Sequence, residues 1–187
     1  MSRSEYEVLL LDARAGYAVY TEKDSSFWVG FGYSSLKLEH DISDLSRVYV
    51  SQVYPGAAGN VFGDYRTYEA KYKMPYLAAW FDMKYKKSFT GSIGVGWSPV
   101  VRTDSEDHFI NYDTLYEAEG KGNAYMIGIR GDYHFARFFT VGMSFNYTKI
   151  NTRGEEEQYD SFALTRTIDY RDYTEVMRTL INIGVSF

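Results

Sequence analysis

The stretch from Phe89 to His108, FTGSIGVGWSPVVRTDSEDH, limits the possible folds of this chain more than any other. Over its first ten residues, larger apolar side chains alternate with small or polar ones. A period of two predicts a β-strand with one apolar and one polar face. At roughly 3.3 Å per residue, a strand of this length reaches about 66 Å, twice the roughly 30 Å hydrocarbon core of a membrane. We therefore predict a strand that crosses a membrane and continues into water, with Asp104, Glu106 and His108 on its polar face.

The composition fits an all-β membrane chain. Aromatic residues make up 18% of the 187 residues, with 19 Tyr, and there are only 3 Pro. Many short alternating segments rich in Tyr and Gly are typical of β-proteins. No run of about 18 apolar residues encodes a transmembrane helix. The absence of cysteine excludes disulfides and thiolate metal sites, and a net charge of -5 gives no basic surface for nucleic acid.

Seven alternating segments follow one another, and their connections alternate between short and long. This is the pattern of an outer-membrane barrel with short periplasmic turns and long external loops. The predicted strands lie at about 6–20, 27–39, 63–85, 89–108, 117–135, 139–148 and 177–187, with long connections at about 40–62, 104–116 and 150–170. Charges at Asp12, Arg14, Arg130, Asp132 and Arg178 fall on the polar face, where they pair across a wet lumen. A soluble barrel or sandwich is the alternative, but it would expose too much aromatic surface.

We therefore predict a single domain, residues 1–187, that forms an antiparallel transmembrane β-barrel of outer-membrane type. Single-chain bacterial barrels use an even number of strands, and an open edge in lipid is costly. We expect that one or more strands precede residue 1. The start MSRSEYEVLL lacks the basic segment and apolar core of a secretory signal, so we expect that a signal was removed or that the sequence is a fragment.

Several segments resemble the omptin family of outer-membrane proteases. YEAKYKMPYLAAW (68–80) resembles the family's strand built around a K-M-P-Y core, and FWVGFGYSSLKL (27–38) resembles the strand before it. DSEDHF (104–109) resembles the D-x-D-x-H-Y stretch that carries half of the active site. The resemblance covers about the last seven of the family's ten strands, and it implies that this chain is part of a ten-stranded barrel.

The resemblance also implies catalytic residues. His108 and Glu106 match the His-carboxylate dyad that activates a water for attack on a peptide, and Asp104 matches the acidic floor that selects basic residues. A carboxylate two residues away on the same strand face orients an imidazole and stabilises its cation. Glu106 stands where the family has Asp. The family's Asp-Asp pair precedes the matched region, and Asp41 and Asp44 are its possible replacements in a different loop. We therefore predict no proteolysis by this chain alone.

Omptins bind lipopolysaccharide on their outer wall, and the matching positions here are Tyr33, Lys37 and Lys71. All three have outward parity, although Ser35 stands where the family has an acidic residue. Tyr and Lys also favour membrane interfaces as ordinary anchors, so both interpretations stay open. The expected partners are outer-membrane lipid, lipopolysaccharide and a substrate with basic residues. We expect no metal, because the histidines are scattered, and no cofactor other than lipopolysaccharide.

Three functions remain compatible with the sequence. The first is an omptin-like endopeptidase that cleaves beside basic residues by means of an activated water. The second is a non-catalytic outer-membrane barrel, an adhesin or a structural protein, which makes contacts through the connections at 40–62 and 150–170. The third is a lipid A hydrolase, which would need an outward Ser-His pair at the membrane interface, and no such pair is aligned.

Overall fold

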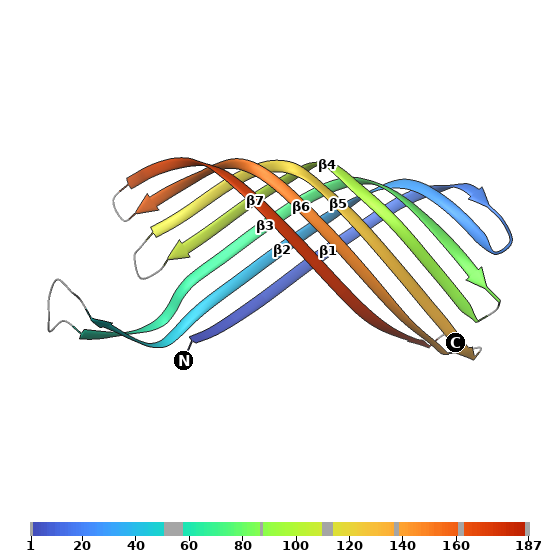
Figure 1. Ribbon diagram of the computed structural model, residues 1–187, viewed down its shortest axis with the longest axis horizontal. Helices are drawn as coiled ribbons and strands as arrows, with labels where there is room; N and C mark the ends of the chain where they lie inside the picture. The colour runs from blue at the N-terminus through green and yellow to red at the C-terminus, as the bar shows by residue number, and fades with distance from the viewer. Residues whose placement is uncertain are drawn as a thin grey trace.

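The computed structural model of the protein describes residues 2–50, 58–86, 88–109, 114–136, 139–160 and 163–185, with side chains described for 4–42, 66–86, 88–109, 114–135, 139–160 and 164–184. Seven antiparallel strands form one sheet, in which the strands follow one another in chain order (Figure 1). They are β1 (Ser2–Thr21), β2 (Ser25–Val50), β3 (Ala58–Tyr85), β4 (Phe89–Phe109), β5 (Thr114–Ala136), β6 (Phe139–Asp160) and β7 (Ala163–Val185). The described ranges contain no helix that is long and apolar enough to span a membrane. The predicted all-β fold with seven long antiparallel strands is confirmed.

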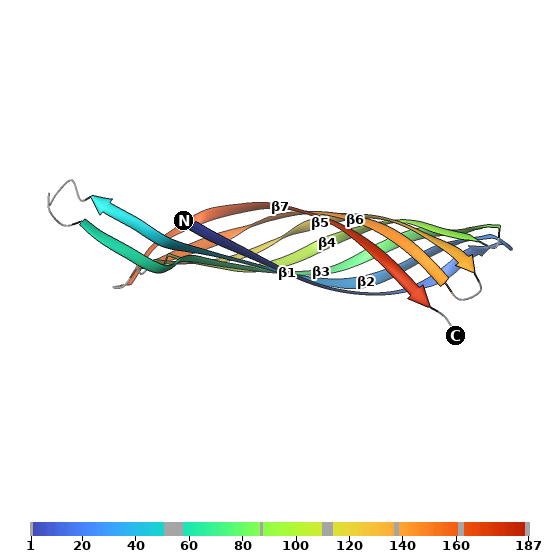
Figure 2. The ribbon, with the colours of Figure 1, turned by 90° about the horizontal axis from the view of Figure 1, so that it is seen from below.

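The sheet has two distinct ends and two edges. The β1–β2, β3–β4 and β5–β6 turns lie together at one end, which we call the short-turn end (Figure 1). The strands twist strongly along their length, and the edge strands β1 and β7 run in crossing directions (Figure 2). No pairing joins β1 to β7 within the described ranges.

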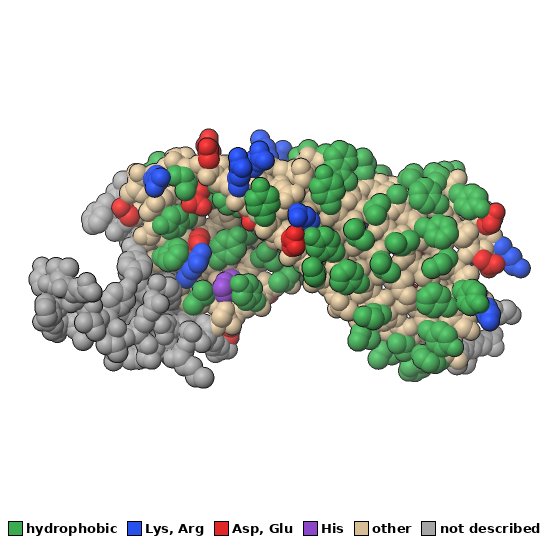
Figure 3. Space-filling model, viewed as in Figure 1, with side chains coloured by type: hydrophobic (Ala, Val, Ile, Leu, Met, Phe, Trp, Pro, Cys, Tyr) green, Lys and Arg blue, Asp and Glu red, His purple; other side chains and the backbone are tan. Residues whose placement is uncertain are grey.

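One face of the sheet is exposed and apolar over the half nearer the short-turn end. We call it the outer face, and its apolar region the apolar band. Phe31 on β2 is 67% exposed, and Ile181 and Ile183 on β7 are 74% and 71% exposed. Apolar side chains cover this half of the molecule, whereas charged side chains gather over the other half (Figure 3). The predicted alternation, with odd-numbered apolar side chains outward, is confirmed in this half. Such a band in water would be an aggregation site, but it suits lipid.

The opposite, inner face buries a small apolar cluster where the sheet coils on itself. Its buried members are Leu36, Ala70, Tyr72, Met74, Val101, Ala124 and Ile150. Tyr72 on β3 donates a hydrogen bond of 2.7 Å to Asp172 Oδ2 on β7, and its hydroxyl lies 2.9 Å from Thr174 Oγ1. One tyrosine side chain therefore joins two strands that are far apart in the order of the sheet.

Nearer the short turns, the inner face is polar. A cavity of about 570 Å³ is lined there by the charged residues predicted to face the lumen, Asp12, Arg14, Arg130, Asp132 and Arg178, together with Tyr76 and others. Tyr76 donates to Asp12 Oδ2 at 3.0 Å, and Arg130 Nε donates to Asp132 Oδ2 at 2.8 Å. Arg14 lies over the ring of Trp80, 4.7 Å from its centroid. Asp12, Arg130 and Asp132 are therefore bonded on the inner face, as the alternation predicted, whereas Arg178 Nε has no hydrogen-bond partner among the described residues.

A β-bulge at Pro99 and Val100 interrupts the alternation of β4. The register shifts there against both neighbours, because β4 has one more residue than β3 or β5. Ser98 and Val101 are consequently both inward, and both are 0% exposed. Ser98 Oγ donates to the carbonyl oxygen of Pro75 at 2.7 Å, which satisfies the buried hydroxyl. Beyond the bulge, odd-numbered residues of β4 face inward and even-numbered ones outward.

The predicted long connections are mostly strand, so their predicted extent is wrong. β2 continues to Val50 and β3 begins at Ala58, while β6 ends at Asp160 and β7 begins at Ala163. These segments pair across the ladder, for example Glu157 with Thr167. Outside lipid, the outer face no longer needs apolar side chains, so the pattern that marks a strand inside the membrane disappears although the ladder continues.

Tyr72 provides a test of the inner closure. Tyr72→Phe removes the hydroxyl that joins β3 to β7 and leaves Asp172 without that donor, so we expect a loss of about 1–2 kcal/mol in the free energy of unfolding. Urea unfolding in phospholipid vesicles, followed by tryptophan fluorescence, measures it. Tyr173→Phe is the matched control, because Tyr173 is 64% exposed on the outer face. Equal stabilities of the two variants would contradict the cross-sheet bond.

Candidate functional site

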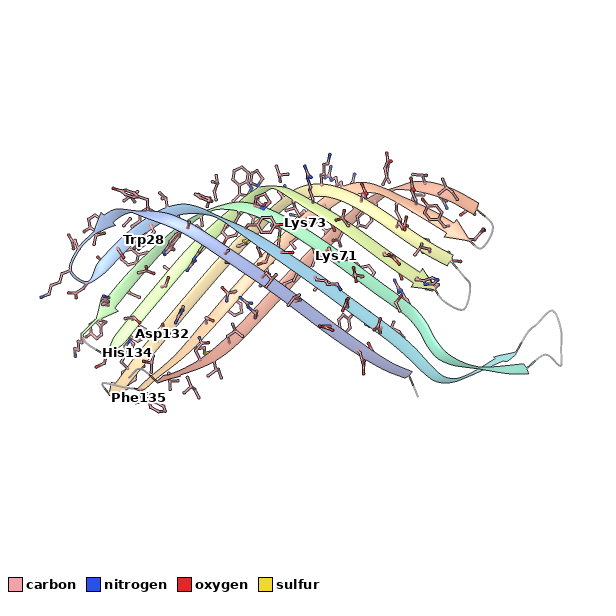
Figure 4. The ribbon with its side chains drawn as sticks, turned by 180° about the vertical axis from the view of Figure 1, so that it is seen from behind. Trp28, Lys71, Lys73, Asp132, His134 and Phe135 are labelled. Carbon is pink, nitrogen blue, oxygen red and sulfur yellow. The ribbon has the colours of Figure 1, made fainter. Side chains whose placement is uncertain are left out.

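On each strand, the apolar band of the outer face ends at a charged residue. Counted from the short-turn end, the first such residues on β1 to β7 are Glu7, Lys37, Lys73, Arg102, Lys121, Lys149 and Glu175. We call these seven residues the boundary line. Five of them are cations, and Lys149 Nζ pairs with Glu175 Oε1 at 3.1 Å. Lys73 and its neighbour Lys71 lie about midway along β3, whereas Asp132, His134 and Phe135 lie near the short-turn end of β5 (Figure 4).

The boundary line descends across the hydrogen-bonded rows from β1 to β7. Relative to the register, it drops two residues from β1 to β2, two from β2 to β3 and four from β5 to β6. The summed displacement of the boundary line is about 26 Å along the strands, at roughly 3.3 Å per residue. The distance from β1 to β7 across the strands is about 29 Å, at roughly 4.8 Å per strand spacing. The boundary line lies parallel to the membrane plane if the strands tilt by about 42° from the barrel axis. This tilt is within the 35–45° usual for barrels. The agreement supports the boundary line as one level of the membrane surface.

The height of the apolar band supports the same placement. On β3, the band runs from Tyr85 at the short-turn end to Lys73. This length of strand is about 40 Å, which at the inferred tilt spans about 29 Å along the membrane normal. Outer-membrane barrels carry apolar bands about 25 Å tall, and hydrocarbon cores are about 30 Å thick.

The bulge of β4 places Asp104, Glu106 and His108 on the outer face. Asp104 and Glu106 are exposed, whereas Thr103, which precedes Asp104 on β4, is 1% exposed and faces inward. Asp107 pairs in register with Tyr68, which packs against the inner cluster. The prediction that the three residues stay on the polar inner face is therefore wrong, because one extra residue at the bulge reverses the alternation. Glu106 and His108 do share one face, as a dyad needs, and their catalytic role stays a prediction.

Glu106 belongs to a row of glutamates that crosses six neighbouring strands. Glu7, Glu39, Glu69, Glu106, Glu117 and Glu157 lie opposite one another in register. Asp104, Glu119 and Glu155 form a second row, nearer the boundary line. We call both rows together the acidic rows. Like charges that face each other across strands repel, so this surface attracts cations.

A groove of about 480 Å³ lies within the acidic rows. It is lined by seven carboxylate side chains together with Lys71: Glu69, Asp104, Glu106, Glu117, Glu119, Glu155 and Glu157. Where the acidic rows border the boundary line, Asp104 Oδ2 lies 3.4 Å from Lys73 Nζ. The groove has the charge that a basic side chain requires, but on the outer face of the sheet.

The three residues matched to lipopolysaccharide binding, Tyr33, Lys37 and Lys71, all lie on the outer face. Tyr33 is 48% exposed, and Lys37 faces Lys71 across β2 and β3. Glu69 pairs with both lysines, at 3.0 Å from Lys37 Nζ. Hydrogen bonds from Lys71 and Lys37 lower the pKa of Glu69 to about 2, and those to Glu39 and Glu69 raise the pKa of Lys37 to about 12. Glu69 and Lys37 therefore stay charged throughout the physiological pH range.

A polar group that the sequence did not predict lies on the inner face, at the end opposite the short turns. Arg66 Nε donates to Asp107 Oδ1 at 2.8 Å, and its guanidinium lies over the ring of Phe109. Ser4 Oγ lies 2.7 Å from His40 Nε2, and the ring of Tyr6 stacks on the imidazole. The signal was a change in alternation, since apolar residues move to even positions on β2 at Leu36. Asp41 points to the outer face, and the side chain of Asp44 lies outside the described residues.

The part of the chain that the structure describes contains no group of three His, Asp or Glu side chains arranged to hold a metal ion. The expectation about cofactors stays a prediction.

Comparisons with known proteins give a likeness of fold. No protein-family model matches the chain, and no curated protein matches it. The crystal structure of the outer membrane protease OmpT from Escherichia coli superposes with a TM-score of 0.65 at 17% sequence identity. The likeness shows the fold. The match covers 96% of this chain and 62% of OmpT, so the chain spans less than two thirds of the protein that it resembles. The expected omptin-like barrel architecture is thereby supported, whereas nothing in the match tests the single-domain boundaries or the site residues.

Adjacent carboxylates on opposite faces test the reversal at the bulge. Asp107→Asn removes the inner partner of Arg66, so we expect a loss of about 1 kcal/mol in the free energy of unfolding. Glu106→Gln removes one charge from the row between Glu69 and Glu117, so we expect equal or slightly higher stability at low salt. Urea unfolding at two salt concentrations measures both. A loss for Glu106→Gln with none for Asp107→Asn would place the two side chains on the other faces.

Proposed function

We propose that this chain forms the wall of an omptin-like outer-membrane barrel whose boundary line binds the phosphate groups of lipopolysaccharide. The observation that carries the proposal is the descent of the boundary line across the register, since a strand tilt of about 42° would bring its five cations to one level of a membrane. The outer-membrane location is supported by the apolar band and by the fold shared with OmpT, an outer membrane protease.

The chemistry of the boundary line suits anionic lipid headgroups. Lysine and arginine extend their apolar stems along a lipid-facing surface and keep their charges at its edge. Arg102 and Lys121 face each other there, with Lys73 on the other side of Arg102. Three cations side by side can contact phosphates that lie at the same depth. Tyr33, Lys37 and Lys71 extend this surface across β2 and β3, in agreement with the lipid contact that the omptin resemblance implies.

Alanine substitutions test the lipid contact. A triple variant, Lys73→Ala, Arg102→Ala and Lys121→Ala, should bind lipopolysaccharide more weakly by about 1 kcal/mol per cation at low salt. Binding of the refolded protein to lipopolysaccharide micelles at several salt concentrations measures it. The control, Lys23→Ala, Lys84→Ala and Lys86→Ala, removes as many cations near the short-turn end. Equal affinities of the two triple variants would rule out binding at the boundary line.

An endopeptidase that cleaves beside basic residues is the second candidate. The groove among the acidic rows favours it, because Asp104 and Glu106 lie with five further carboxylates where a basic side chain can bind. His108 on the same face would accept the proton of the attacking water, and Glu106 would stabilise the resulting imidazolium. The fold shared with OmpT supports this candidate only as an analogy.

A fluorogenic peptide that contains Arg-Arg, tested on the full-length gene product in lipopolysaccharide, separates the candidates. If the dyad acts, the full-length protein cleaves the peptide and His108→Ala loses at least about 10²-fold in kcat, as expected for a general base. His134→Ala is the control, because His134 bonds Thr140 at 2.8 Å near the short-turn end. Unchanged cleavage by His108→Ala would remove the dyad. No cleavage by the full-length protein would favour a non-catalytic barrel, an adhesin or a structural protein.

A further inference from the structure

A buried guanidinium nitrogen on the inner face has no partner. Arg178 lies on β7 and lines the cavity of about 570 Å³ near the short turns. Its Nε is buried and makes no hydrogen bond within the part of the chain that the structure describes. A buried N–H of a charged group without an acceptor is strongly destabilising, so such groups are almost always paired in folded proteins. The position of Arg178 therefore indicates an acceptor that the described strands do not supply.

The other charges of this cavity leave positive charge in excess. Four cations and three carboxylates line it: Arg14, Lys84, Arg130, Arg178, Asp12, Asp82 and Asp132. Two of the carboxylates are already bonded, since Asp132 accepts from Arg130 and Asp12 accepts from Tyr76. None of these described carboxylates accepts a hydrogen bond from Arg178 Nε. The missing acceptor is therefore expected to carry a negative charge.

The wall beside Arg178 leaves room for a bound group. The row of register partners that begins at Arg178 continues with Asn146, Gly128, Gly94 and Trp80. Asn146 and the two glycines also line the cavity. A methyl group at Gly128 would meet only the end of the Asn146 side chain, at 3.0 Å, so neither backbone crowding nor a left-handed conformation requires glycine there. Glycine inside a strand often marks a place where a ligand comes close to the backbone.

The donors beside these glycines suit an oxyanion. Arginine offers a planar fork of N–H donors that matches a carboxylate or a phosphate, and the amide of Asn146 can donate from the neighbouring strand. Arg14 lies over the ring of Trp80, at the other end of the same row, and adds a second positive charge. Because the outer face of this half carries the apolar band, the surroundings polarise weakly and opposite charges attract more strongly. The volume of the cavity is within the range of about 300–1,000 Å³ that is usual for small-molecule sites.

We propose that Arg178 and Asn146 bind an oxyanion, a carboxylate or a phosphate, against the glycine wall of this cavity. The anion is either a small free molecule or the carboxylate of a side chain from another part of the full-length protein, and both present the same pair of oxygens to the guanidinium. The proposal is independent of lipid binding and of proteolysis, because the cavity lies on the inner face, whereas the boundary line, Glu106 and His108 lie on the outer face.

Binding of inorganic phosphate to the refolded full-length protein in detergent, measured by titration calorimetry, tests for a free anion. Arg178→Gln should weaken a saturable site at least about tenfold, because it removes a charged donor. Gly128→Ala should also weaken it, because a methyl group then occupies the wall while every charge stays, and this variant decides if Arg178→Gln does not fold. Two controls should bind as the wild type does: Arg171→Gln, exposed on the outer face of the same strand, and Gly184→Ala, where a methyl group meets only Thr140 at 3.8 Å. Saturable binding that survives both test variants would overturn the proposal.

A crystal structure of the full-length protein, grown without phosphate or sulfate, tests for a side-chain carboxylate. If the wild type binds no phosphate, the site is already filled, and we expect a carboxylate oxygen of the protein within about 3.2 Å of Arg178 Nε. Only water or an uncharged oxygen beside Arg178 in that structure, together with no binding of phosphate, would overturn the proposal.

Discussion

Hydrogen bonding between neighbouring strands is the interaction on which the rest of this structure depends. Inside hydrocarbon, each backbone N–H and C=O must find a partner within the protein, because no water is there to bind it. The ladders from β1 to β7 meet this requirement between neighbouring strands, whereas the outer edges of β1 and β7 have no strand partner within the described ranges. They also hold the outer side chains in register, which is why the boundary line and the acidic rows form ordered surfaces and not scattered charges.

The same sheet reverses its polarity at the membrane surface. Within the apolar band, the outer face meets lipid, and the inner face holds paired charges such as Arg130 and Asp132. Beyond the boundary line, the outer face carries the acidic rows, and apolar side chains such as Ala70 and Ile150 are buried inside. Burial of apolar area in the second half drives the sheet to coil on itself, whereas in the first half lipid covers the apolar side chains.

How the reversal occurs explains what could be predicted from the sequence. Strands in the apolar band follow from strict alternation, as at Phe27–Tyr33. On β2, the reversal appears in the sequence as a change in the parity of the apolar residues, which reach Leu36 and Leu38. On β4 it does not, because Val95, Trp97 and Val101 keep odd numbers while the bulge at Pro99 turns the chain. The sequence therefore predicts the strand that carries Asp104 and Glu106 correctly but places these two side chains on the wrong face.

Charge at both limits of the apolar band fixes the depth of the sheet in a membrane. Movement of the sheet toward the short-turn side brings the cations of the boundary line into hydrocarbon, and the acidic rows follow. A Lys or Arg on the lipid face lowers the stability of a barrel by about 2–4 kcal/mol at the membrane midplane and by about 0–1 kcal/mol near the interface. Movement the other way brings the charges of the short turns, such as Lys23 and Lys86, into the same environment. Each charge adds a small cost near the interface, but the register moves all seven strands together, so the costs sum over the whole sheet. The depth is therefore set cooperatively, and the bulge of β4 contributes to it, because without the extra residue Arg102 would face the inner apolar cluster and not the membrane surface.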